Sequence, residues 1–105
     1  MFDDRKKQFE KKFELDSEKK FKVIALRNRY LAKWAANQQN ISEKDLEKYT
    51  KEVLLSDFEK PGDEDVVEKL HKDFAEAQLD ISANDIRKKI DHYYYLALKE
   101  IEDNI

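Results

Sequence analysis

The acidic stretch around the single Pro-Gly pair has the spacing of a possible metal site. Counting Asp57 as position one of a calcium-binding loop places acidic residues at positions three, nine and twelve, and Gly62 at position six. However, Pro61 occupies position five, where an oxygen ligand belongs, and Glu64 occupies position eight, which is normally apolar. We therefore interpret the stretch as an acidic corner between two helices, with a calcium loop as the alternative.

Other residue types that carry out chemistry lack the neighbours they would need. His71 and His92 fall on separate predicted helices, without a second ligand at a metal-binding spacing, and the sequence has no cysteine. A single glycine cannot build a phosphate-binding loop, and the serines fit helix caps or polar helix positions. The sequence therefore predicts a protein that is not an enzyme, with no catalytic residue, no metal site and no cofactor.

The composition is typical of a small helical protein with a large charged surface. The 105 residues fit one domain, 43% of them are charged, and one Gly and one Pro leave few tight turns for an all-β fold. The 21 basic and 24 acidic residues give a net charge of −3, which lacks the basic field that nucleic acids require. No signal peptide and no apolar run of about 20 residues is present. We expect no nucleic-acid partner, no membrane insertion and a cytoplasmic location.

Four helices are predicted, and the first of them is long. Nothing before Gln39 is glycine or proline, so one helix of about 35 residues, about 50 Å long, is expected from Asp3 to about Gln38. Helices are also predicted after Ser42 to about Phe58, after Asp63 to about Gln78, and after Ser82, where apolar residues recur at four-residue steps from Ile86 to Ile101, with Ser42, Asp63 and Ser82 as N-caps. Short connections predict an all-α, small four-helix bundle, with the long N-terminal helix partly projecting from it.

The two halves of the first predicted helix differ in their surfaces. The second half carries an apolar face that is expected to enter the core, formed by Phe21, Val23, Ile24, Leu26, Tyr30, Leu31, Trp34 and Ala35. Asn28 lies close to this face, either as a buried hydrogen-bonding group or as a boundary residue. The first half has a thin line of Phe2, Phe9 and Phe13 among thirteen charged residues in the first twenty.

This difference predicts two units, a segment of residues 1–20 that binds another protein and a bundle of residues 21–105. Seven basic and six acidic residues are mixed in the segment, which fits neither a basic membrane helix nor a nucleic-acid arm. A solvated helix end and the seam of a homodimeric coiled coil remain alternatives. In the last helix, Tyr93, Tyr94 and Tyr95 spread around the axis, so at least one ring should be exposed and could contact a partner.

Several motifs occur together with a specific spacing. They are Phe2-Asp3-Asp4-Arg5, Phe13, Arg27-Asn28-Arg29, Trp34-Ala35-Ala36 and the stretch from Ser56 to Val66, followed by Lys69 and Asp73. On these residues the chain resembles the ATPase inhibitor subunit zeta family of alpha-proteobacterial F-type ATP synthases, from Phe2 to about Phe74. It departs from the family at Ala32-Lys33, where a glycine is expected.

The resemblance implies a four-helix bundle whose N-terminal segment enters a catalytic interface of the F-type ATP synthase, among its alpha, beta and gamma subunits. There the segment would block ATP hydrolysis and leave synthesis largely free, on the cytoplasmic side of the membrane-bound enzyme. By this resemblance the inhibitory segment contains Phe2, Asp3, Asp4, Arg5 and Phe13. The helical pattern adds Lys6, Lys7, Phe9 and Lys12 as further partner-binding residues. The free protein is expected to be a monomer, and the alternative is a helical adaptor or self-associating scaffold.

Overall fold

The computed structural model describes residues 17–57 and 62–103 of the chain. These residues form four helices and no strand: α2 (Ser17–Gln38), α3 (Glu43–Ser56), α4 (Glu64–Glu76) and α5 (Ala83–Asp103). The all-α class and the small bundle are thereby confirmed, and the ends predicted for α3 and α4 lie two residues beyond those observed. The part of the first predicted helix before Ser17 lies outside the described residues, so its projection from the bundle stays a prediction.

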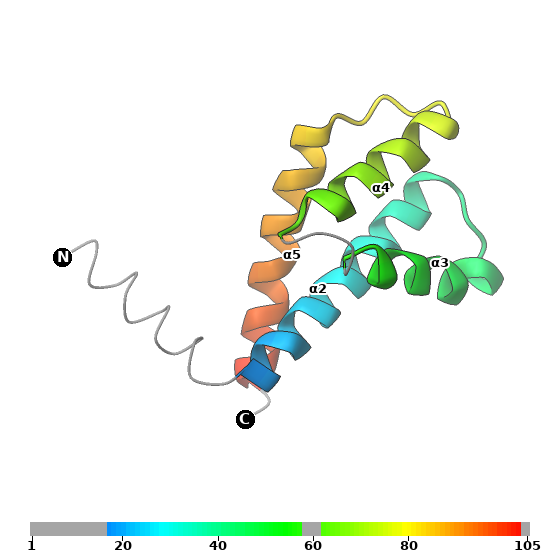
Figure 1. Cartoon of the computed structure of the whole chain (residues 1–105). Helices are drawn as coiled ribbons and strands as arrows, with labels where there is room; N and C mark the ends of the chain where they lie inside the picture. Colours follow the sequence, from blue (N-terminus) through cyan, green and yellow to red (C-terminus); the bar gives the residue numbers. More distant parts are fainter. Residues whose placement is uncertain (1–16, 58–61, 104–105) are drawn as a thin grey trace.

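Helices α2 and α5 form an antiparallel pair along the length of the bundle, and α3 and α4 lie across one end of that pair (Figure 1). The antiparallel direction follows from the contacts. The ammonium group of Lys89 lies 5.6 Å from the ring centroid of Trp34, and the Tyr30 hydroxyl donates a hydrogen bond to Glu100, further along α5. The first half of α2 therefore packs against the last half of α5.

The core divides into two clusters because α3 and α4 are short. The larger cluster takes buried side chains from all four helices, among them Leu31, Val53, Leu70, Phe74 and Ile86. The smaller cluster consists of Val23, Ala97 and Leu98, with Leu26, Tyr30, Tyr94 and Ile101 packed around them, all from α2 and α5. The first half of α2 is therefore held in the core mainly by α5.

The expectation that Phe21 enters the core is wrong, since its side chain is 60% exposed. Val23 is buried against α5, and Phe21 lies about 200° around the helix axis from it, where no described helix covers α2. The other predicted core residues of this face are buried or half-buried. The Trp34 ring meets the Phe74 ring edge to face, with 5.3 Å between the centroids.

The ends of α2 and α4 are built in the same way. Asn40 and Gln78 have positive φ angles of 58° and 61° directly after the last turn. The next N–H group in each case, that of Ile41 or Leu79, donates to a carbonyl five residues earlier, at 2.9 and 2.8 Å. These are Schellman motifs, and they turn the apolar Ile41 and Leu79 back onto the core.

The predicted N-caps occupy the predicted positions but differ in what their side chains bind. Ser82 precedes α5, and its hydroxyl accepts a hydrogen bond from the N–H of Asp85 at 3.0 Å. Ser42 is the N-cap of α3, yet its hydroxyl contacts the Asp45 carboxylate at 3.2 Å instead of capping the backbone. Asp63 is the N-cap of α4 and makes no side-chain cap either, because its carboxylate is used elsewhere.

Replacing Gln78 by glycine should stabilise the bundle. A left-handed backbone conformation costs a β-carbon-bearing residue about 1–2 kcal/mol, and glycine avoids that cost at the residue after a helix. After subtracting the larger entropy of glycine in the unfolded chain, we expect Gln78→Gly to raise the free energy of unfolding by about 0.5–1 kcal/mol, measured by urea denaturation. Asn40→Gly is the matched control and should gain less, because asparagine tolerates this conformation. Equal losses in both variants would contradict the expectation.

Candidate functional site

The residues predicted to bind a partner all precede the first described helix. They are Phe2, Asp3, Asp4, Arg5, Lys6, Lys7, Phe9, Lys12 and Phe13, and they lie outside the described residues. Their role therefore stays a prediction. Residues 17–20, which were assigned to the same segment, are helical and form the start of α2. What the structure describes is the helical body that follows the segment in the chain.

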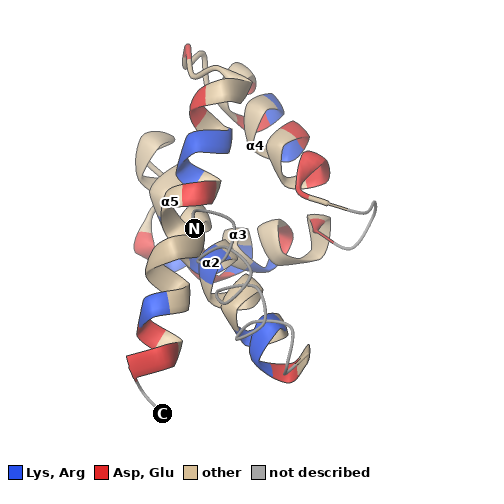
Figure 2. Ribbon diagram, turned by 90° about the vertical axis from the view of Figure 1, so that its left-hand side faces the viewer, with Lys and Arg blue, Asp and Glu red and all other residues tan. Residues whose placement is uncertain are grey.

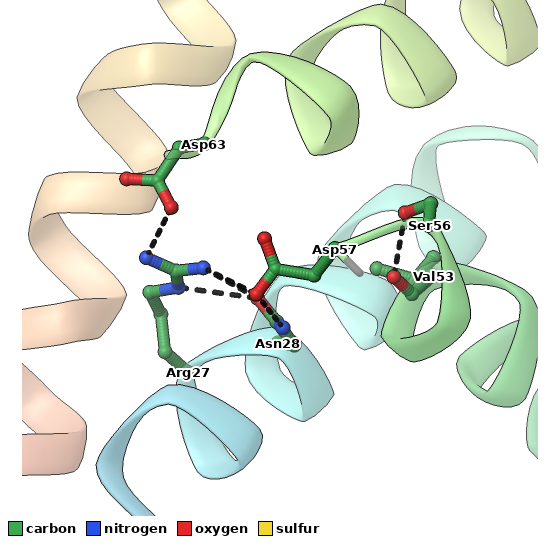
Figure 3. A network of polar contacts seen from close by, with 6 residues as sticks. All are labelled: Arg27, Asn28, Val53, Ser56, Asp57 and Asp63. Atoms are coloured by element: carbon green, nitrogen blue, oxygen red, sulfur yellow. Dashed lines mark hydrogen bonds and ion pairs between the residues drawn. The ribbon is translucent and has the colours of Figure 1, made fainter. Parts of the chain in front are cut away.

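The most developed polar feature of the described residues is a network of four side chains in the middle of the body (Figure 3). We call Arg27, Asn28, Asp57 and Asp63 the Arg27 network. The Arg27 guanidinium donates to Asp63 Oδ1 at 2.9 Å and lies 3.5 Å from Asp57 Oδ2. Asn28 accepts from Arg27 at 2.9 and 3.1 Å and donates to Asp57 at 3.1 Å. One helix thereby binds both sides of the acidic corner.

The burial of this network explains why its side chains need partners inside the protein and how it positions the helices. Arg27 is 3% exposed and Asn28 is 2% exposed, so each must find its hydrogen-bond partners inside the protein. Asp57 is the C-cap of α3 and Asp63 is the N-cap of α4, so the carboxylates stand at the two ends of the corner. Because Arg27 binds both, it fixes the angle between α2 and the α3–α4 pair.

The carboxylates of the acidic corner thus bind the Arg27 guanidinium of α2. Within residues 17–57 and 62–103, no cluster of three or more His, Asp or Glu side chains is placed to hold a metal ion. Gly62 has a φ of +83°, a conformation that a turn here requires and that glycine adopts without strain. His71 and His92 are both exposed, and of the three consecutive tyrosines Tyr95 is 60% exposed, as expected for at least one ring.

Burial raises the pKa of the Asp57 carboxyl above its ordinary value of 3.8. The hydrogen bond from Asn28 and the charge of Arg27 act in the opposite direction, and the negative charges of Asp63 and Asp65 add to the rise. The loss of hydration on burial is the largest of these effects. The corner therefore carries a carboxyl group that is held in place by its partners and ionises less readily than an exposed aspartate.

A second network joins the far end of α2 to α3 and α4. The buried Tyr49 hydroxyl donates to Asp73 at 2.8 Å and accepts from the Gln39 side chain at 2.8 Å. The Lys69 ammonium lies 2.9 Å from Asp73, 3.6 Å from Glu52 and 5.3 Å from the Tyr49 ring centroid. Burial and the bond to Asp73 raise the pKa of Tyr49, which keeps the hydroxyl protonated and able to donate.

The sequence contained a signal for the Arg27 network that motif matching alone did not use. Val23, Arg27, Leu31 and Ala35 follow one another at four-residue steps on the same side of α2. An arginine in the middle of such an apolar line must be buried with its charge, and it needs carboxylates nearby. The two aspartates that cap the ends of the corner are the natural candidates.

None of the described helices is both long and apolar enough to cross a membrane.

Removing the Arg27 guanidinium should destabilise the body strongly. Arg27→Met keeps the apolar stem but leaves the Asp57 carboxylate, whose side chain is 13% exposed, without its cation. We expect the free energy of unfolding to fall by about 3 kcal/mol, measured by urea denaturation. Arg29→Met is the matched control, because Arg29 is exposed on the same helix two residues later, and it should change stability by less than about 0.5 kcal/mol. Similar losses in the two variants would remove the special role of Arg27.

The raised pKa of Asp57 predicts a pH dependence of stability with a definite sign. The protonated Asp57 carboxyl contributes stability because the folded protein holds this proton more tightly than the unfolded chain does. This contribution is fully present below pH 3.8 and is lost as the pH rises through the raised pKa of the folded state. We therefore compare the free energies of unfolding of the Asp57→Asn variant and wild type. The value for the variant minus the value for wild type should rise as the pH increases from about 3 to about 6. Urea denaturation of both proteins across this range tests the trend, and a carbon-13 titration that places the Asp57 carboxyl below 3.8 would contradict it.

Comparison with known proteins adds to this geometry. A comparison with curated protein sequences finds no match. A family model described as ATPase inhibitor subunit zeta matches residues 1–100, which include both the segment before α2 and nearly all of the helical body. The chain therefore belongs to the ATPase inhibitor subunit zeta family, the family that its motifs resemble.

Proposed function

We propose that this protein inhibits ATP hydrolysis by the F-type ATP synthase by inserting its N-terminal segment, residues 1–20, into a catalytic subunit interface. The observation that carries the proposal is the family match over residues 1–100, which includes this segment. The inhibitor role follows from the family, and the insertion of the segment is our inference. On this proposal the protein is a regulator that performs no reaction of its own.

The energetics of the segment favour a role in binding. Burying Phe2, Phe9 and Phe13 would contribute about 5–9 kcal/mol in total. Ordering some 18 residues costs roughly 1–2 kcal/mol each in backbone entropy, which helical hydrogen bonds offset only in part. The segment therefore gains most when a partner covers its three phenylalanines. The described core clusters, in turn, draw their buried side chains from α2 to α5.

The body supplies the mount for this segment. Residue 16 leads directly into α2, and α2 is bound to α5 by the smaller core cluster and to the α3–α4 corner by the Arg27 network. A segment that continues from such a helix starts from a fixed point on a body with extents of 45 × 26 × 23 Å. We infer that the body stays outside the enzyme and limits how far the segment can enter.

The mixed charges of the segment suit an interface made by several subunits. Its seven basic and six acidic residues can form ion pairs with groups of either sign on the alpha, beta and gamma subunits, on the cytoplasmic side. A wedge at an interface that closes during hydrolysis and opens during synthesis would block only the first direction. This is how we account for an inhibitor that leaves synthesis largely free.

Replacing Phe9 and Phe13, which are four residues apart in the segment, should weaken inhibition without unfolding the body. We expect the full-length Phe9→Ala/Phe13→Ala variant to need at least about a hundredfold higher concentration for half inhibition of ATP hydrolysis by the cognate synthase, since each buried ring contributes about 1.5–3 kcal/mol. Its melting temperature should equal that of wild type. Leu55→Ala is the control, because Leu55 is 67% exposed on α3, and it should inhibit normally.

The same variant separates the inhibitor from the adaptor or scaffold. For an inhibitor, sedimentation of wild type and variant should show the same monomer, and only the hydrolysis assay should differ. A tight wild-type homodimer that the variant loses, together with no effect of wild type on hydrolysis, would favour the scaffold and contradict the proposal.

A further inference from the structure

The exposed ring of Phe21 belongs to a short apolar strip on the first half of α2. We call Phe21, Ile24 and Ala25 the Phe21 strip. They share one helix face because they are three and four residues apart. Phe21 is 60% exposed, and Ile24 and Ala25 are half-buried. The strip is therefore open to a partner, with its largest side chain the most exposed.

The strip is open because the corner covers this face of α2 only further along. Asn28 continues the same face, and it is buried and bonded to Asp57 at the end of α3. Before Asn28, α5 covers the side of α2 that carries Val23 and Leu26. Figure 1 shows that the start of α2 lies at the end of the body away from α4.

Charged residues surround the strip without covering it. Glu18 and Lys22 stand 4.0 Å apart as a helical ion pair, with side chains 80% and 64% exposed. Figure 2 shows basic and acidic residues together at this end of α2. The strip is thus an apolar patch with a polar rim, as in other protein–protein interfaces, and a partner would match it with an apolar patch of its own.

The position of the strip in the chain points to its occupant. Residues 1–16, which carry Phe9 and Phe13, lie outside the described part and end five positions before Phe21. On a continuous helix Phe21 would lie about 12 Å beyond Phe13 and about 80° around the axis. A groove that takes Phe9 and Phe13 would therefore reach the strip within two turns.

We propose that the Phe21 strip is the last contact of the inhibitory segment and docks on an apolar surface of the ATP synthase next to the site of Phe9 and Phe13. This inference rests on the proposed function and extends the interface into the described body. The strip sets the depth at which the segment stops, because the corner and its charged network begin at Asn28.

Other occupants fit less well. The segment itself could reach the strip only by reversing direction within residues 14–16, because residues 17–20 already form the start of α2. A second copy of the chain would need about 800 Å² on each partner for a stable dimer, which three side chains do not supply.

The test is the full-length Phe21→Ala variant in the hydrolysis assay with the cognate synthase. We expect about a tenfold rise in the half-inhibitory concentration, since one exposed aromatic ring loses its contact. Helix fraying cannot cause this rise, because alanine is the stronger helix former. Phe21→Leu should retain most of the inhibition, and Leu55→Ala, equally exposed on α3, should retain all of it.

The outcomes distinguish this inference from the proposed function. If Phe21→Ala inhibits as wild type does while Phe9→Ala/Phe13→Ala fails to inhibit, the inference is overturned and the proposed function stands. If wild type itself does not inhibit, the proposed function fails first. A lower melting temperature of Phe21→Ala, or a wild-type dimer in sedimentation that this variant abolishes, would assign the ring to the body or to a second copy and overturn the inference.

Discussion

A buried guanidinium is the constraint on which the arrangement of the helices depends. Arg27 stands in an apolar line of α2, where a charge is costly unless carboxylates and hydrogen bonds surround it. The chain supplies these from residues 30 and 36 positions further on, at the end of α3 and the start of α4. Any displacement of the corner from α2 would leave this charge buried without its carboxylates, so the packing of α3 and α4 on α2 has one favoured geometry.

This constraint divides α2 into two parts with different tasks. From Arg27 onward the helix is covered by α3, α4 and α5, and its small residues Ala32, Ala35 and Ala36 are fully buried, which allows close packing. Before Arg27 it is covered mainly by α5, through Val23 and Leu26. The first part can therefore present Phe21 to another protein while the second part keeps the helix in place. On our proposal, binding and folding rely on different turns of the same helix.

Local patterns made most of the fold predictable, and pairings across the chain did not. The serine N-caps and the Pro-Gly corner are read from a few adjacent residues, and the ends predicted for α3 and α4 lie two residues beyond those observed. The error at Phe21 arose because an apolar residue on a helix is buried only if another helix covers that side, which the pattern of one helix cannot show. Predicting the Arg27 network would have required knowledge of which distant aspartates contact α2, and the sequence does not show this. Residues 2–13 were assigned by resemblance and helical pattern, and the described residues do not reach them.

On the proposed function, an inhibitor that works by insertion has to keep an apolar surface exposed without associating with itself, and the charged composition of the chain favours both. With 43% of its residues charged and both signs mixed, the surface around the Phe21 strip discourages a large apolar contact between copies. Three side chains still suffice where a partner already binds the neighbouring phenylalanines, because the strip then adds contacts to a complex that has met its ordering cost. The strip is too small to bind alone and well placed to extend an existing interface, which is the property that a final contact of an inserted segment requires.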